Sequence, residues 1–188
     1  NRIAEITAHY TQDPDIKKMT FVSAQVERDY YGIATRVEEI LIFAQRMGYK
    51  KVGIATCVAL LKECHMFAKV AKAKGIQIYA AACKVGSVDK TTIGLQEADK
   101  LRPNQFEAMC NPALQAEALN EAGTEFNVIL GLCVGHDTLF IMHSRAPVTY
   151  LVVKDRVLCH NPIAALHTTE TYYKRLLSPG FPDPRPLE

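Results

Sequence analysis

Four short apolar runs occur along the chain, separated by longer segments in which apolar residues recur at helical spacing. The runs cover 51–56, 76–82, 127–132 and 148–153, and their length and β-branched content are typical of buried strands. The intervening segments 58–75, 112–123 and 136–143 predict helices. Because a strand, a helix and a strand in that order form a right-handed parallel crossover, the pattern predicts an α/β fold. We expect a single three-layer domain with a mostly parallel sheet of about four strands flanked by helices.

The two ends of the chain carry less regular patterns. Residues 1–10 predict a short amphipathic helix, 11–19 a connector, and 24–46 a helix that supports the sheet. Near the other end, an Asn-Pro pair at 161–162 predicts the start of a final helix that runs to Leu177.

Residues 84–109 interrupt this regular alternation. They contain Gly86, Gly94 and Pro103 and show no sustained periodicity, so we expect a long excursion with at most one short helix. Loops of this length inside a compact domain commonly serve as lids or binding loops. We therefore expect the excursion to cover a functional site.

Composition and charge narrow the classes of function. Lys and Arg number 22 against 20 Asp and Glu, a formal charge of +2, which provides no overall electrostatic footprint for nucleic acid or a membrane surface. The 188 residues are 48% hydrophobic, enough for a full core, and no apolar stretch is long enough to cross a bilayer. Six cysteines without a secretory signal indicate a reducing compartment, so we expect a soluble, cytoplasmic protein.

Four of the cysteines follow the predicted elements in a regular way. Cys57, Cys83 and Cys133 come at the ends of predicted strands, and Cys110 stands just before a helix that leads back into the sheet. Their separations are 26, 27 and 23 residues, about one strand-helix unit each. Because the carboxyl ends of parallel strands share one edge of a sheet, we expect all four thiols at that edge. Cys64 lies within a predicted helix and is expected to be a buried core residue.

Four thiolates suit either zinc or an iron–sulfur cluster, since soft sulfur ligands favour both. Structural zinc sites bring ligands in close C-x-x-C pairs, and this chain has none. The spacing therefore favours an iron–sulfur cluster on Cys57, Cys83, Cys110 and Cys133, with zinc as the alternative metal. A thiol-redox or small-molecule-binding module without metal also remains open.

Several neighbouring residues are candidates for further roles at this edge. His136, Asp137 and His160 are the candidate catalytic residues, because they follow the last two strands. Lys154, Asp155 and Arg156 either bind an anionic substrate or pair among themselves. Cys159 is a further possible ligand, although it lies several residues past its strand. Lys84 and Lys90 in the excursion are expected to be solvated.

Five segments of the chain resemble one protein family. They read GIATC (53–57), ACKVGSVDK (82–90), FEAMCNPALQAEALNEAGTEFNV (106–128), GLCVGHDTLF (131–140) and APVTYLVVKDRVLCHNP (146–162). Together they resemble domain of unknown function 1847, an uncharacterised metal-binding family of mainly anaerobic prokaryotes. The resemblance extends from about 24 to 166 and implies a metal site without an established reaction.

The family pattern carries over to individual positions of this sequence. It matches Cys57, Cys83, Cys110 and Cys133, which are here called together the strand-end cysteines. It also matches seven polar residues: His136, Asp137, Lys154, Asp155, Arg156, His160 and Asn161. Cys159 departs from it, because the family more often has a small residue there. The family also tends to carry a cysteine-rich segment near the N-terminus, and this chain has none.

These observations combine into one hypothesis. The chain divides into an N-terminal helix and connector (1–23), an α/β metal-binding domain (24–177) and a Pro-rich C-terminal tail (178–188). The domain carries an iron–sulfur cluster for redox or cluster-based chemistry on an unknown substrate; the alternatives are a zinc-binding structural or regulatory protein, or a metal-free thiol module. If the protein is an enzyme, we expect an iron–sulfur oxidoreductase; if it is not, we expect an electron-transfer protein. A redox partner protein and a homo-oligomer are compatible with either.

Overall fold

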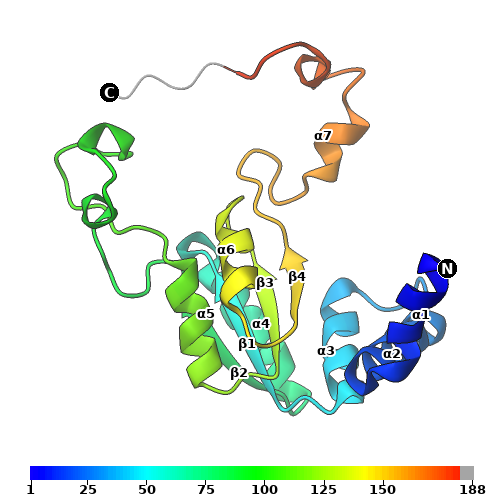
Figure 1. Ribbon diagram of the computed structural model, residues 1–188. Coiled ribbons are helices and arrows are strands. Elements are labelled where there is room, and N and C mark those ends of the chain that lie inside the picture. Colours follow the sequence, from blue (N-terminus) through cyan, green and yellow to red (C-terminus); the bar gives the residue numbers. More distant parts are fainter. Residues whose placement is uncertain (183–188) are drawn as a thin grey trace.

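The computed structural model describes residues 1–182 and contains a four-stranded parallel sheet (Figure 1). The strands are β1 (Lys51–Thr56), β2 (Gln77–Ala82), β3 (Phe126–Leu130) and β4 (Val148–Val152), in the spatial order β2-β1-β3-β4. Each β1 residue from Val52 to Thr56 pairs on both sides, so β1 and β3 form the buried centre. The predicted α/β fold with a parallel sheet is confirmed.

Helices flank the sheet and precede it in the chain. Their bounds are α1 (Arg2–Gln12), α2 (Pro14–Tyr30), α3 (Arg36–Met47), α4 (Leu61–Ala73), α5 (Pro112–Glu121), α6 (His136–His143) and α7 (Ile163–His167). Short 3-10 turns occur at Val58–Leu60, Lys90–Ile93, Glu97–Asp99 and Lys174–Leu177. Across residues 1–182, none of the helices is both long enough and apolar enough to cross a membrane.

Two hydrophobic cores lie on opposite faces of the sheet. On one face, Ile54 and Val128 of the strands pack with Ile40 of α3 and Phe67 of α4. On the other face, side chains of β1 and β3 pack with Leu119 of α5 and Phe140 of α6. Alternate strand residues thus face different helix pairs, which explains the near-continuous apolar runs in the sequence. The result is the expected three-layer arrangement.

The chain changes direction across the sheet between β1 and β3. After β1 it passes through α4 on one face to β2, whereas after β3 it passes through α6 on the other face to β4. Such a switch point leaves a crevice outside the carboxyl ends of the two central strands, and ligands of open α/β sheets bind there. The strand ends that carry Cys57 and Cys133 flank this switch point.

The structure differs from the sequence prediction at both ends of the chain. Helix α2 begins at Pro14, inside the connector expected over 11–19, because Asp13 accepts hydrogen bonds from the N–H groups of Asp15 and Ile16 and Pro14 occupies the first helical turn. The single helix expected over 24–46 is divided between α2 and α3. A turn with Gly32 at φ +68° then separates α2 from α3. The predicted final helix to Leu177 is wrong: α7 ends at His167. Of the predicted tail, 178–182 are described without helix or strand, and 183–188 lie outside the described residues.

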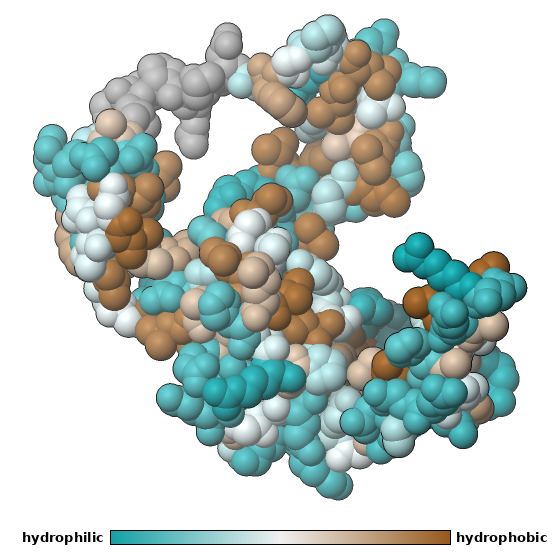
Figure 2. Space-filling model, in the orientation of Figure 1, coloured by the Kyte–Doolittle hydropathy of each residue, from teal (hydrophilic) through white to brown (hydrophobic). Residues whose placement is uncertain are grey.

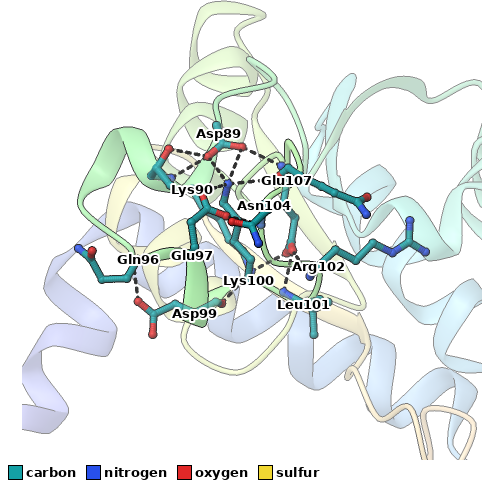
Figure 3. A network of polar contacts seen from close by, with 12 residues as sticks. Asp89, Lys90, Gln96, Glu97, Asp99, Lys100, Leu101, Arg102, Asn104 and Glu107 are labelled. Atoms are coloured by element: carbon teal, nitrogen blue, oxygen red, sulfur yellow. Dashed lines mark hydrogen bonds and ion pairs between the residues drawn. The ribbon is translucent and has the colours of Figure 1, made fainter. Parts of the chain in front are cut away.

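The excursion from 84 to 109 holds no strand and is organised by charge (Figure 3). The buried ammonium of Lys100 lies 3.0 Å from Asp89 Oδ1 and 2.9 Å from Glu97 Oε1. Hydrogen bonds from Thr91, from a backbone N–H and from Lys100 hold the pKa of Asp89 well below its usual range. In Figure 1 the excursion rises beside the carboxyl edge of the sheet, and Figure 2 shows open space between it and the C-terminal segment.

Candidate thiol site

Cys57 and Cys83 lie side by side at the carboxyl edge, because Thr56 of β1 pairs with Ala82 of β2. Both side chains are buried. The backbone N–H of Val58 donates to Cys83 Sγ over 3.4 Å. Burial alone would raise the pKa of Cys57, but the Ala59 N–H, Lys154 and Cys83 together hold it below its ordinary value. These contacts favour the thiolate form of Cys57 more than water does for a free thiol.

Cys110 reaches the same place from the far end of the excursion. The N–H of Asn111 donates to the carbonyl of Cys83 over 2.8 Å, and the Asn111 side chain caps α5 by accepting from Leu114. This anchor holds the Cys110 thiol against Cys83. A hydrogen bond from Cys83 lowers the pKa of Cys110 to about 5, and the same contact raises that of Cys83. The pair thus holds one thiolate and one thiol at neutral pH.

Cys133 follows β3 and contacts an arginine rather than another cysteine. Arg156 Nη2 donates to Cys133 Sγ over 3.0 Å. This hydrogen bond is the largest cause of the raised pKa of Arg156, and electrostatic attraction to Cys133 is the second. Attraction to Cys57 and Cys110 raises this pKa further. Arg156 therefore lies within electrostatic reach of three of the four strand-end thiols.

A buried glutamine supports the edge from α5. Gln115 Nε2 donates to the carbonyls of Thr56 and Ala81 over 3.2 and 2.7 Å, one residue before Cys57 and two residues before Cys83. Because both partners are acceptors, the amide orientation is fixed. Its Oε1 is buried without a hydrogen-bond partner in the described part of the chain. An unsatisfied acceptor of this kind marks a place where a further donor can bind.

The chain was compared with known proteins to place this arrangement. The sequence profile of a family described as "Protein of unknown function (DUF1847)" matches residues 1–151. An uncharacterised protein of Methanocaldococcus jannaschii is 44% identical over 173 residues, which cover 92% of this chain and 86% of that protein. The chain belongs to the DUF1847 family. The resemblance expected from the sequence is thereby confirmed, and the matched residues include all four strand-end cysteines.

The other predicted site residues of this DUF1847 protein lie around the thiols. His136 begins α6, and its charge contributes to lowering the pKa of Cys110. Asp137 hydrogen-bonds to Tyr150, where burial first and Asp137 second raise the pKa of the tyrosine. His160 accepts the N–H of Asp155 at Nδ1 over 3.1 Å. None of the three makes a direct hydrogen bond to a thiol within the described residues.

The remaining two cysteines are separate from this group. Cys64 is buried in α4, as the sequence predicts, and burial raises the pKa of its thiol. Cys159 is exposed in the loop after β4. All six cysteines are free thiols. Within residues 1–182, no three or more His, Cys, Asp or Glu side chains are arranged to hold a metal ion as they stand.

Sequence reasoning named Lys84, Lys154 and Arg156 but missed their contacts with the thiols of the DUF1847 site. Lys84, expected in solvent, is half-buried, donates to the carbonyl of Ala108 and helps to lower the pKa of Cys110. Lys154 and Arg156 turn to the thiols of Cys57 and Cys133 instead of pairing with Asp155. These contacts depend on how the loops fold back over the edge, which hydrophobic spacing does not encode. Gly86, two residues after Lys84, is a sequence signal for a turn there, and its φ of +85° shows that the turn forms.

Proposed function

We propose that the thiol site of this DUF1847 protein binds a metal centre of the iron–sulfur type and carries out redox or cluster-based chemistry. The observation that carries the proposal is the convergence of Cys57, Cys83 and Cys110, delivered by three separate segments, through mutual contacts at Cys83. Cys133, held at the same edge by Arg156, would be the fourth donor. Core packing alone gives no reason for thiols to gather at strand ends.

The donor set fits such a centre by its chemistry. Thiolates are soft ligands that select iron–sulfur clusters, zinc or copper(I) over hard cations. Lys84, Lys154 and Arg156 supply positive charge to the thiols, and that charge favours an anionic thiolate-bound group. The side chains are not a closed cage as they stand, so binding includes their reorientation toward a common point.

Each part of the chain would have a defined task at a bound centre. A cluster supplies electron transfer or a Lewis-acidic iron. Lys154 and Arg156 would offset the thiolate charge, and hydrogen bonds to sulfur of this kind raise the reduction potential of a cluster. His136, at the start of α6 and within electrostatic reach of Cys110, would be the candidate proton donor or acceptor at the site.

The proposal is tested by metal analysis of protein purified without oxygen. We expect broad visible absorption near ~400 nm together with iron and acid-labile sulfide, the signature of thiolate-bound clusters. Stoichiometric zinc in a colourless protein would contradict the iron–sulfur assignment and favour a structural or regulatory zinc site. Colourless protein without metal would contradict the metal centre altogether.

A metal-free thiol function is the second candidate, because one observation favours it specifically. The Cys83–Cys110 contact joins a thiolate whose pKa is lowered to about 5 to a neighbouring thiol. Such a thiolate–thiol pair forms a disulfide by passing two electrons and one proton to an oxidant such as another disulfide, which is reduced to a thiol and a thiolate. Mass spectrometry of metal-free protein after treatment with oxidised glutathione distinguishes it: a Cys83–Cys110 disulfide supports this candidate, and two unmodified thiols contradict it.

A further inference from the structure

An open cavity of about 830 Å³ lies beside the thiol site, along the carboxyl end of β4 and the loop that follows it. Lys154, Arg156 and His160 are part of its wall. Lys154 and Arg156 are also the cations that contact Cys57 and Cys133. The cavity therefore shares two side chains with the thiols, and its volume suits a small organic ligand.

The loop from 154 to 160 fixes the polar wall of this cavity. The N–H of Asp155 donates to His160 Nδ1, so the proton of the neutral imidazole resides on Nε2 and makes it a donor. The Asp155 carboxylate accepts two backbone N–H groups of the loop, over 2.9 and 2.8 Å. Cys159 and His160 have φ values of +50° and +65°. Such conformations cost energy in non-glycine residues and occur preferentially at binding sites.

Donors therefore exceed free acceptors on this wall. Lys154, Arg156 and the Nε2 of His160 offer N–H groups, whereas the carboxylate of Asp155 is engaged within its own loop. Glu63, the other carboxylate of the lining, is exposed on the first turn of α4. The rest of the lining, apart from Cys159, is apolar and consists of Ala59, Leu60, Leu151, Val152, Val153 and Pro162. A fitting ligand has an oxyanion at one end and a short apolar body at the other.

We propose that this cavity binds a small organic oxyanion, a carboxylate or a phosphate ester, and presents it to the thiol site as substrate. Anion binding is inferred from the cavity and its hydrogen-bond donors. That the bound anion is a substrate rests on the proposed function. Arg156 would contact both Cys133 and the ligand, and would so hold the ligand next to the thiol site.

The test is isothermal titration of anaerobically purified protein with butyrate, with methyl phosphate and with butyramide. Butyramide has the carbon skeleton of butyrate but no charge. We expect butyrate or methyl phosphate to bind at one site per chain at least tenfold more tightly than butyramide. The tighter of the two anions assigns the ligand as a carboxylate or as a phosphate ester. Equal affinity for all three compounds would overturn the inference.

Variants locate the binding site. Arg156→Met is expected to weaken anion binding at least tenfold, and His160→Asn, which tolerates a positive φ, at least threefold. Arg102→Met is the matched control, because Arg102 is exposed in the excursion away from the cavity lining, and it should bind as wild type does. Wild-type affinity in both Arg156→Met and His160→Asn would overturn the inference.

Iron and sulfide analysis of the same samples separates the two proposals. Anion binding by a protein without metal would support the cavity and contradict the metal centre. A metal-loaded protein that binds no anion would overturn the cavity and leave the metal centre in place.

Discussion

At the scale of single residues, the most informative side chain is Cys110. Its thiol is half-buried, contacts Cys83 and has a pKa of about 5, whereas burial raises that of Cys64. Hydrogen bonds and positive charge that lower the pKa of a thiol mark a reactive or metal-binding environment, whereas a pKa raised by apolar burial alone marks an inert core position. This chain thus contains both kinds of cysteine. Cys64 is an internal control for every experiment on the cysteines of the thiol site.

Alkylation of reduced, metal-free protein tests the state of Cys110. Because its folded pKa lies below the ordinary value, the thiolate persists as pH falls and is lost only near pH 5. We expect the rate of Cys110 modification by iodoacetamide, followed by peptide mass spectrometry, to have its midpoint there. In Cys83→Ala the midpoint should move upward, since the hydrogen bond that stabilises the thiolate is lost. A midpoint near ~8.5 in both proteins would contradict the contact.

Gly53 shows how a second residue governs packing at the centre of the sheet. An added Cβ would lie 2.1 Å from Asn127 Oδ1 and 2.9 Å from Leu119 Cδ1. The Asn127 amide cannot easily move, because it bonds to Thr124 and Ser144 over 2.8 Å each. We expect Gly53→Ala to lower the free energy of unfolding by about 1–3 kcal/mol in urea titrations. Ala80→Val, at an exposed position of β2, should stay within ~0.5 kcal/mol of wild type.

At the scale of elements, the strands could be predicted because each is a short apolar run, which burial on both faces requires in β1 and β3. The helix from His136 to His143 has the predicted bounds. The helical part of 11–19 could not be assigned from apolar spacing alone, since Val22 and Val26, the buried residues of α2, lie beyond that stretch. Where the last predicted helix ends early, the hydroxyls of Thr168 and Thr169 donate to the carbonyls of Ala164 and Leu166, and such side-chain hydrogen bonds compete with helical backbone bonds.

The excursion is an element whose order depends on one ammonium group. Lys100 joins Asp89, Glu97 and the carbonyl of Gln105. We expect Lys100→Met to raise amide hydrogen exchange of residues 89–107 at least tenfold, because two carboxylates lose their shared partner. Exchange in β1 and β3 should not change. Lys62→Met, at an exposed position of α4, is the matched control, and unchanged exchange in Lys100→Met would contradict the role of this network.

At the scale of the whole molecule, the thiols gather where the topology predicts a ligand. The sheet order β2-β1-β3-β4 places the switch point between β1 and β3, and the cysteines that follow these strands lie on either side of it. The sequence was sufficient to place Cys57, Cys83, Cys110 and Cys133 at the carboxyl edge of the sheet, because the apolar pattern predicts where each strand ends. The contacts of Lys84, Lys154 and Arg156 with these thiols could not be predicted, because loops that return over the edge follow no periodicity.

The central claim is that the strand-end cysteines act as one metal centre, and iron and sulfide analysis of two serine variants tests it most directly. Cys83→Ser removes the thiol that contacts both Cys57 and Cys110, while Cys64→Ser changes an equally buried cysteine in α4. Both proteins are purified without oxygen beside wild type. The account predicts that Cys83→Ser loses most of its iron and sulfide and that Cys64→Ser retains the wild-type content. Equal metal content in the two variants, or none in wild type, would contradict it.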